Sequence, residues 1–526
     1  MDAPDRAKPD GGSLLASIGL AVGATLVFLL LLELAGRVFE QVDPPADHHL
    51  ARGREKRVAV PDPVPGAYRI FLYGGSTIVG APVTELSYLA QLEFWLERLS
   101  PDRPVQIVNF AVNGRPSGYA LAELERTLPH RPDLVIVLTA HNDFQRWKPE
   151  GDWDRLRRSI GGVLEQTAVA RTLRRAGYAV RDRAGVLPEL RPPLWIVPED
   201  RDGERFRERA EGYRTNTREI VRRTREAGVP LILATGPANL SDWPPVHRFV
   251  HDADYAPRMQ AIWDRIRQGD LAGAEAGLQR GSETYPGDAM IAWLTGRLAA
   301  ARGDTSEAAA FFDLAADLDP IPWRVLTAFN DHVRELGLAA GVHLADVDAA
   351  FRREAADGLV GWELVADNCH PTPYGGAILA RELLLAMARA GLLIDAASLQ
   401  RLPGLDDQWK VFEEAALRAR PGLWLEYLLT NARYVMKWPF YHFEASRRYL
   451  EQARALAPDE WQVPANLGSL AVLEGRLDEG RRQLERAEAL FGGPLVVRDR
   501  NRTPYLREAT ALLSGELPAF VPPEVE

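Results

Sequence analysis

A serine stands directly behind a predicted strand, in a setting that suits a nucleophile. Residues 69–77 read Arg-Ile-Phe-Leu-Tyr-Gly-Gly-Ser-Thr. The apolar and aromatic run 70–73 predicts a buried strand, and the two glycines behind it permit a sharp turn. Ser76 then lies at the carboxyl end of a strand, where open α/β sheets bind their ligands. A Gly-Gly-Ser turn is also common in ordinary loops, so the polar residues elsewhere in the chain must show whether Ser76 is a nucleophile.

A serine hydroxyl needs a base, because it is a weak nucleophile at neutral pH. The run Asp367-Asn-Cys-His370-Pro371 supplies a candidate pair late in the chain. His370 could take the proton of Ser76, and Asp367 could orient the imidazole and stabilise its cation. The alternative is a loop hydrogen bond between these two residues with no chemical role.

Attack on an acyl carbonyl produces an oxyanion, which requires preorganised hydrogen-bond donors. Two further loops follow predicted strands, Asn-Phe-Ala-Val-Asn-Gly at 109–114 and Thr-Ala-His-Asn-Asp at 139–143. The Asn142 amide and the backbone N–H groups of Gly114 and Ser76 would supply three donors. Gly114 could instead be a turn glycine, and Asn142 could cap a helix. His141 is predicted to be structural, or to contact the catalytic residues without contacting the substrate.

In this order, the four blocks resemble the SGNH/GDSL hydrolase superfamily, in the variant with Gly-Ser-Thr in the first block. The resemblance covers about 67–255 and 321–395. Ala140 departs from it, because the third block usually has glycine there, and its methyl group could narrow the pocket or shift Asn142. The resemblance implies an ester hydrolase in which acyl moves to Ser76 and then to water, with His370 as base and then acid. It implies no metal and no organic cofactor.

The segments around these blocks alternate between strand and helix patterns. Expected strands cover 68–73, 105–111, 134–138, 230–234 and 342–347, and expected helices cover 86–99, 119–128 and 204–226. Such alternation predicts an α/β fold with a doubly wound parallel sheet. The layering expected from the family resemblance is flavodoxin-like.

An internal repeat interrupts this pattern. Gly269-Asp270 recurs as Gly303-Asp304, and Pro286 recurs as Pro320. The spacing, with the segment 293–296 and its glycine, resembles a tetratricopeptide repeat, in which glycine lets helices meet closely and proline ends the second helix. A similar unit is expected at 449–487. Such repeats bind peptides or proteins, or this layer only packs against the hydrolase domain.

The amino-terminal region predicts a membrane anchor. Residues 14–32 contain no charged residue, and 19 helical residues span about 28 Å, close to a bilayer core. No cleavage site of a signal peptide follows, and a buried soluble helix is the alternative. Lys and Arg counts on the two flanks favour a cytoplasmic body, whereas membrane-anchored relatives commonly act on envelope material. On that family argument we expect an extracytoplasmic catalytic domain, periplasmic or at the cell surface.

Composition excludes several classes of protein. The net charge is −10, from 63 Lys and Arg against 73 Asp and Glu, and no basic patch with interleaved aromatics occurs, so we expect no nucleic-acid partner. Cys369 is the single cysteine, which excludes an internal disulfide and a cysteine-based zinc site.

Two further segments allow two interpretations each. The arginine-rich segment 152–186 is expected to be an amphipathic helix with a solvated face, or else a lid or a lipid-binding surface. The aromatic-rich segment 420–445 is expected to be helix packing rather than a carbohydrate platform.

The expected organisation and function follow from these parts. The chain divides into a tail (1–12), an anchor (13–36), a proline-rich stalk (37–66), a hydrolase domain in two parts (67–255 and 321–395), an inserted repeat (256–320) and a C-terminal helical region resembling the repeat (396–526). The leading hypothesis is a membrane-anchored serine esterase acting on an acylated polysaccharide, a lipid or another envelope ester. One alternative is an O-acyltransferase that passes the acyl group to a sugar hydroxyl through the same residues. A second is an inactive hydrolase fold that serves as a repeat scaffold with a protein partner.

Overall fold

The computed structural model describes residues 58–80, 82–144, 201, 203–245, 252, 254–436, 442–495 and 502–515. All of them belong to one compact unit, residues 57–147 with 191–526. No helix within these ranges is long and apolar enough to cross a bilayer. The predicted anchor, most of the stalk and the segment 152–186 lie outside the described residues.

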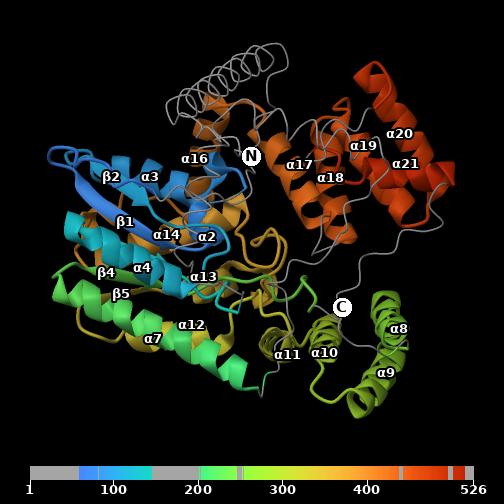
Figure 1. Cartoon of the computed structure of the whole chain (residues 1–526), viewed down its shortest axis with the longest axis horizontal. Coiled ribbons are helices and arrows are strands. Elements are labelled where there is room, and N and C mark those ends of the chain that lie inside the picture. The colour runs from blue at the N-terminus through green and yellow to red at the C-terminus, as the bar shows by residue number, and fades with distance from the viewer. Residues whose placement is uncertain are drawn as a thin grey trace, which may run out of the picture. The chain divides into compact units, whose positions relative to one another are not determined.

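Five parallel strands form the sheet, in the order β2-β1-β3-β4-β5 (Figure 1). The strands are β1 (Tyr68–Gly74), β2 (Val105–Asn109), β3 (Leu134–Leu138), β4 (Leu231–Ala234) and β5 (Val342–Ala345). The predicted parallel sheet is therefore confirmed, with all five strands where the sequence pattern expects them. Strands β2 and β3 flank β1 on its two sides, so the strand order switches there, and such switch points are where these folds bind ligands.

Side chains of the strands alternate between two apolar cores, which is why the sheet is covered on both faces. Phe71 and Tyr73 of β1 join one core, and Ile70 and Leu72 join the other. The first core includes residues of α4 (Ser117–Thr127), α7 (Glu204–Glu226) and α12 (Thr327–Leu336), and the second includes residues of α3 (Tyr88–Leu99), α13 (Val347–Glu354) and α14 (Pro373–Arg389). The doubly wound arrangement follows from this alternation.

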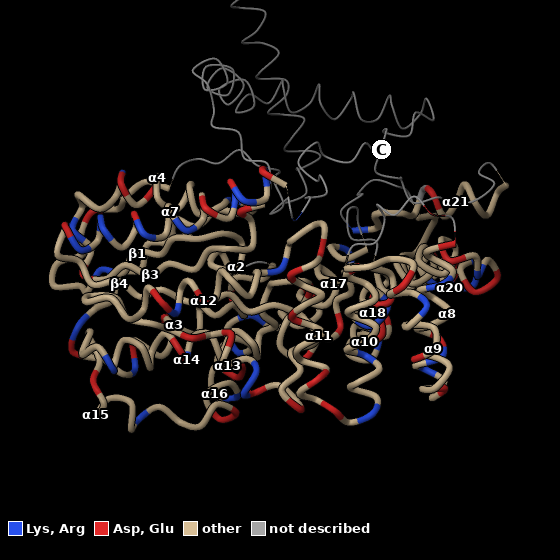
Figure 2. The backbone as a smooth tube through the Cα atoms, turned by 90° about the horizontal axis from the view of Figure 1, so that it is seen from below, with Lys and Arg blue, Asp and Glu red and all other residues tan. Residues whose placement is uncertain are grey.

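Helix α7 shows why a strongly charged stretch is still a helix of the fold. Its buried residues include Tyr213, Ile220 and Val221. On its other face, Arg223 pairs with Glu219 at 2.8 Å, and Figure 2 shows acidic and basic residues interspersed along this helix. Pairs of this kind are worth only a few tenths of a kcal/mol each, so apolar burial holds the helix.

The inserted repeat consists of two helix pairs, α8 (Tyr255–Gln268) with α9 (Leu271–Thr284), and α10 (Ala289–Ala301) with α11 (Thr305–Leu318). The repeated Gly-Asp pair makes each turn between paired helices. Gly303, at φ 81°, follows the end of α10, and Asp304 caps α11 by accepting from the Glu307 N–H at 2.9 Å. Gly296 lets the helices of the second pair meet, because a Cβ there would lie 2.7 Å from the Phe312 ring.

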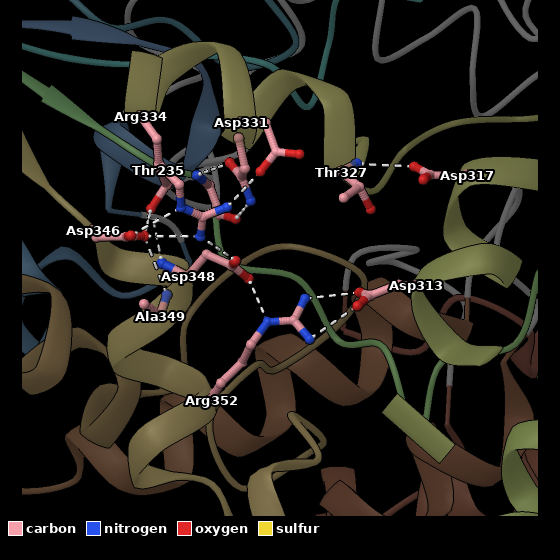
Figure 3. Close-up of polar contacts among 12 residues, drawn as sticks. Thr235, Asp313, Asp317, Thr327, Asp331, Arg334, Asp346, Asp348, Ala349 and Arg352 are labelled. Atoms are coloured by element: carbon pink, nitrogen blue, oxygen red, sulfur yellow. Dashed lines mark hydrogen bonds and ion pairs between the residues drawn. The ribbon is translucent and has the colours of Figure 1, made fainter. Parts of the chain in front are cut away.

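An ionic network ties α11 to the catalytic domain (Figure 3). Arg352 of α13 donates to both carboxylate oxygens of Asp313 on α11, at 2.7 and 3.2 Å, and to Asp348 at 3.1 Å. Arg334 of α12 reaches the same Asp348 at 2.7 Å, and Asp317 of α11 accepts from the Thr327 N–H at 2.9 Å. The repeat is thereby fixed to α12 and α13, the helices that precede and follow β5 in the chain.

The remaining described segment is helical: α15 (Ala396–Leu399), α16 (Leu405–Ala419), α17 (Leu423–Met436), α18 (Phe443–Leu456), α19 (Gln462–Leu473), α20 (Leu477–Phe491) and α21 (Leu506–Ser514). A third apolar cluster joins α17, α18 and α19 to Val83, Leu86, Trp243 and Ala366 of the catalytic domain. Trp424 and Tyr427 pack within it as expected, whereas Tyr434 is partly exposed.

Candidate active site

The predicted nucleophile lies at the end of β1, as the sequence pattern expects. Ser76 is the first residue of a short helix, α2 (Ser76–Val79), which ends at Gly80 with φ 81°. The sequence pattern places the first helix later, at 86–99, so this short helix begins earlier than expected. A contact from β2 stabilises it, because the side chain of Asn109, the last residue of that strand, donates to the Ile78 carbonyl at 2.8 Å. Ser76 is partly buried, and its position is fixed by the end of β2 as well as by β1.

The two glycines before Ser76 are required by close contacts rather than by positive φ angles. A Cβ on Gly74 would lie 2.2 Å from the Leu138 carbonyl oxygen of β3. A Cβ on Gly75 would lie 2.3 Å from Nδ2 of Asn142. The missing side chain of Gly75 therefore makes the space in which the Asn142 amide lies beside the nucleophile turn.

The three predicted oxyanion donors belong to loops that meet here. Asn142 donates from Nδ2 to the Arg115 carbonyl at 3.2 Å, which ties the third block to the residue after Gly114. Gly114 is exposed and has φ 72°, a value that favours glycine.

Asp143 fixes this loop to α4. Its carboxylate accepts from the Ser117 N–H at 3.1 Å and from the Ser117 hydroxyl at 2.5 Å. Burial raises the pKa of Asp143 to about 6, although hydrogen bonds from Ser117 and the Ala140 backbone act in the opposite direction. The contact also explains why α4 begins at Ser117, two residues before the predicted start.

Ala140, which replaces the usual glycine, has φ 112°. Residues other than glycine rarely adopt this backbone conformation, which costs about 1–3 kcal/mol of strain. The next residue, His141, is buried, and neither of its ring nitrogens has a hydrogen-bond partner in the described chain. Burial, with a smaller contribution from His370, lowers the pKa of His141 to about 3, so this imidazole is neutral.

Asp367 and His370 form the predicted pair, in a tight loop. Oδ2 of Asp367 lies 2.6 Å from Nδ1 of His370. Oδ1 accepts from the backbone N–H groups of Cys369 and His370, both at 2.8 Å. These contacts fix the carboxylate and the imidazole relative to each other, and both side chains are buried.

The two groups shift each other's protonation. Burial alone would lower the pKa of His370, but the charge of Asp367 and their hydrogen bond raise it well above its usual value. Burial alone would raise the pKa of Asp367, but the charge and hydrogen bond of His370 hold it below its usual range. The pair therefore favours an imidazolium beside a carboxylate.

The loop with this pair touches the nucleophile turn across a separation of 292 residues, where the Thr77 hydroxyl donates to the Cys369 carbonyl at 3.5 Å. Thr77 follows Ser76, and Cys369 precedes His370. Nε2 of His370 is buried and makes no hydrogen bond within the described chain. The hydrogen bond between a catalytic base and its nucleophile is often long or poorly aligned until substrate binds.

Asp367, Cys369 and His370 also offer three ligand atoms that lie within 4.8 Å of one another, close enough for all three to contact one metal ion. Nδ1 of His370 is already bonded to Asp367, and burial raises the pKa of the Cys369 thiol, which opposes the thiolate that a metal would need. The residues fit an Asp–His pair better than a metal site.

Three tyrosines of the C-terminal helices meet this loop, and the sequence pattern assigned none of them to the site, although two lie in the aromatic-rich segment 420–445 that was expected to pack. The Tyr449 hydroxyl donates to the Ala366 carbonyl at 2.6 Å. The Tyr434 ring lies against His370, with centroids 6.2 Å apart. Tyr427 lines a small cavity with Thr77 and Pro371. The spacing of Tyr427 and Tyr434, seven residues along one helix, was the available signal.

Comparison with protein families agrees with the residue blocks. Residues 72–251 match the GDSL-like Lipase/Acylhydrolase family, and residues 259–320 match the Tetratricopeptide repeat. The first match includes Ser76, Gly114 and Asn142 but ends before Asp367 and His370. None of the curated proteins matches the chain.

Solved structures give a weaker likeness. Axe2, an acetylxylan esterase from Geobacillus stearothermophilus, is 14% identical with a TM-score of 0.27, over 61% of this chain and 95% of its own. LAE5, an alpha/beta hydrolase from the metagenome of Lake Arreo, is 14% identical with a TM-score of 0.28, over 61% and 94%. A GDSL-like lipase from Parabacteroides merdae is 13% identical with a TM-score of 0.29, over 60% and 94%.

Because these TM-scores lie well below 0.5, the likeness to solved structures says nothing about the activity of this chain. The family matches and the residue blocks agree with each other: residues 72–251 resemble a GDSL-like lipase/acylhydrolase domain, and residues 259–320 resemble a tetratricopeptide repeat.

Proposed function

We propose that this protein is a membrane-anchored serine hydrolase that cleaves an ester, with Ser76 as nucleophile, His370 as general base and Asp367 as the residue that orients it. The observation that carries the proposal is the buried Asp367–His370 pair, whose Nδ1–Oδ2 distance is 2.6 Å. With Nδ1 bonded to Asp367, Nε2 is the ring nitrogen left to exchange a proton with Ser76.

The reaction would proceed in two steps. Nε2 of His370 takes the proton of the Ser76 hydroxyl as the oxygen attacks the acyl carbon, and the resulting imidazolium returns that proton to the departing alcohol. Water then attacks the acyl-serine with His370 again as base, which releases the acid and restores Ser76. Atoms balance with one water consumed per ester bond.

The oxyanion of each step would be stabilised by the Ser76 N–H, the Gly114 N–H and the side-chain amide of Asn142. Support comes from the contact of Asn142 with Gly75 and with Arg115, which holds the amide beside the nucleophile turn. A single donor of this type is typically worth about 10²–10³ in rate.

The anchored location rests on sequence. The uncharged stretch 14–32 is long enough for one bilayer crossing, and we propose that the catalytic domain faces the extracytoplasmic side, where an envelope ester would be the substrate. Fractionation of the full-length protein tests the anchor, and protease added to spheroplasts, in which the outer face of the cytoplasmic membrane is accessible, tests the side. Release by salt washing would contradict an anchor, and complete protection from protease would contradict the proposed side.

The activity is tested by labelling the full-length protein with a fluorophosphonate probe, beside Ser76→Ala and His370→Ala. We expect labelling of the native protein alone. A folded native protein that stays unlabelled would refute the activated serine and favour the scaffold alternative. Product analysis with an acyl ester and a polysaccharide acceptor then separates hydrolysis from acyl transfer.

A further inference from the structure

The C-terminal helices reach the loop that holds Asp367 and His370. The Tyr449 hydroxyl of α18 donates to the Ala366 carbonyl at 2.6 Å, with both residues buried. Ala366 in turn donates its N–H to the His370 carbonyl at 2.7 Å. A residue of α18 therefore supports the turn that positions the imidazole.

Helix α17 presents two tyrosines on one face, because residues seven apart lie two turns from each other. Tyr427 is buried and lines a small cavity beside Thr77 and Pro371. Burial raises the pKa of Tyr427 and of Tyr449, and the negative charge of Asp367 contributes to both shifts. The two phenol groups therefore lie within electrostatic range of the catalytic pair.

Tyr434 has a larger exposed fraction than these two, although burial also raises the pKa of its phenol well above the usual value. Its exposed fraction is 37%, and its ring lies against His370 with the ring planes at 82°. Tyr427 and Tyr449 are each 4% exposed. Tyr434 therefore places a partly exposed aromatic ring beside the imidazole.

The side of the ester that Tyr434 meets follows from the proposed reaction. The acyl oxygen must point to the Ser76, Gly114 and Asn142 donors, whereas the alcohol oxygen must lie at His370 to receive its proton. A side chain against the His370 ring is therefore next to the alcohol part of the ester and not next to the acyl oxygen.

We propose that Tyr434 determines specificity for the alcohol part of the ester, and that this alcohol carries a sugar ring, for which a half-exposed tyrosine offers an apolar face and a polar edge. The inference rests on the proposed esterase activity. The C-terminal helices would then complete the active site, with Tyr434 as their contact with substrate.

The test compares two acetate esters, penta-O-acetyl-glucose and ethyl acetate, with the full-length native protein and with Tyr434→Ala and Tyr434→Phe. In the native protein we expect a higher kcat/KM for the sugar ester. Tyr434→Ala should lower the ratio of the two kcat/KM values at least fivefold, mainly through KM for the sugar ester. Tyr434→Phe, which keeps the ring, should preserve the ratio within twofold.

Tyr285→Ala is the matched control, because Tyr285 is a partly exposed tyrosine within the repeat whose hydroxyl and ring contact Asp252 and Tyr255. It should leave the ratio unchanged. An equal loss for both esters in Tyr434→Ala, or a native protein that shows no preference for the sugar ester, would overturn the inference. Fluorophosphonate labelling separates this result from failure of the esterase proposal, since in that case the native protein would not label either.

Discussion

Replacement of Asp367 by asparagine removes a charge with little change of shape, at the residue that orients the proposed base. The carboxylate accepts three hydrogen bonds, two from backbone N–H groups at 2.8 Å and one from Nδ1 of His370 at 2.6 Å. An asparagine oxygen can keep one or two of these, but its amide can also donate to Nδ1 and select the wrong tautomer. In that case Nε2 carries the proton and cannot accept one from Ser76.

The expected loss is large. The same change in a Ser-His-Asp triad costs about 10⁴ in rate, which corresponds to about 5.4 kcal/mol at 1.36 kcal/mol per tenfold change. We expect the rate of fluorophosphonate labelling in Asp367→Asn to fall by about 10³–10⁴, while circular dichroism stays that of the native protein. Asp270→Asn, at the N-cap of α9, is the control for the chemical change and should label at the native rate.

The pH dependence gives a second readout of the same variant. His370 must be neutral to act as base, and Asp367 raises its pKa well above the usual value. The native labelling rate should therefore rise with pH through a range well above the usual histidine pKa of about 6.5. Without the carboxylate charge, the pKa of His370 falls and this limb should move to lower pH. A native-like rate with an unmoved limb would refute the role assigned to Asp367.

Three further substitutions test the site. Gly75→Ala places a Cβ 2.3 Å from Nδ2 of Asn142, so labelling should slow by about 10²–10³; an unchanged rate would show that the amide is not an oxyanion donor. Ala140→Gly should raise the free energy of unfolding by about 1 kcal/mol, since φ is 112° there, and a lower urea midpoint would contradict this strain. Tyr449→Phe leaves the Ala366 carbonyl without its 2.6 Å donor, so urea unfolding should show a loss of about 1–3 kcal/mol; no loss would argue against this contact.

Much of the fold could be predicted because its signals are local. Apolar runs of strand length alternating with helical patterns predicted the parallel sheet, and the recurring Gly-Asp pair predicted the repeat. The Asp367–His370 pair was also local, because three residues of one loop suffice to form all its hydrogen bonds. In each case the spacing along the chain decides which groups can meet, and the sequence displays that spacing.

Other features depended on tertiary structure. Thr77 and Cys369 are 292 residues apart in the sequence. They meet only because of the order of the strands in the sheet, which cannot be read from the spacing of residues along the chain. The space that Gly75 leaves for Asn142 and the positive φ of Ala140 depend on how loops from different strands meet. The approach of Tyr434 to His370 required α17 to pack on the catalytic domain. The sequence by itself determined which reactive groups the chain carries and in what local loops. Only the tertiary structure decided which of them meet, because contacts between distant segments are set by side-chain packing and strand order.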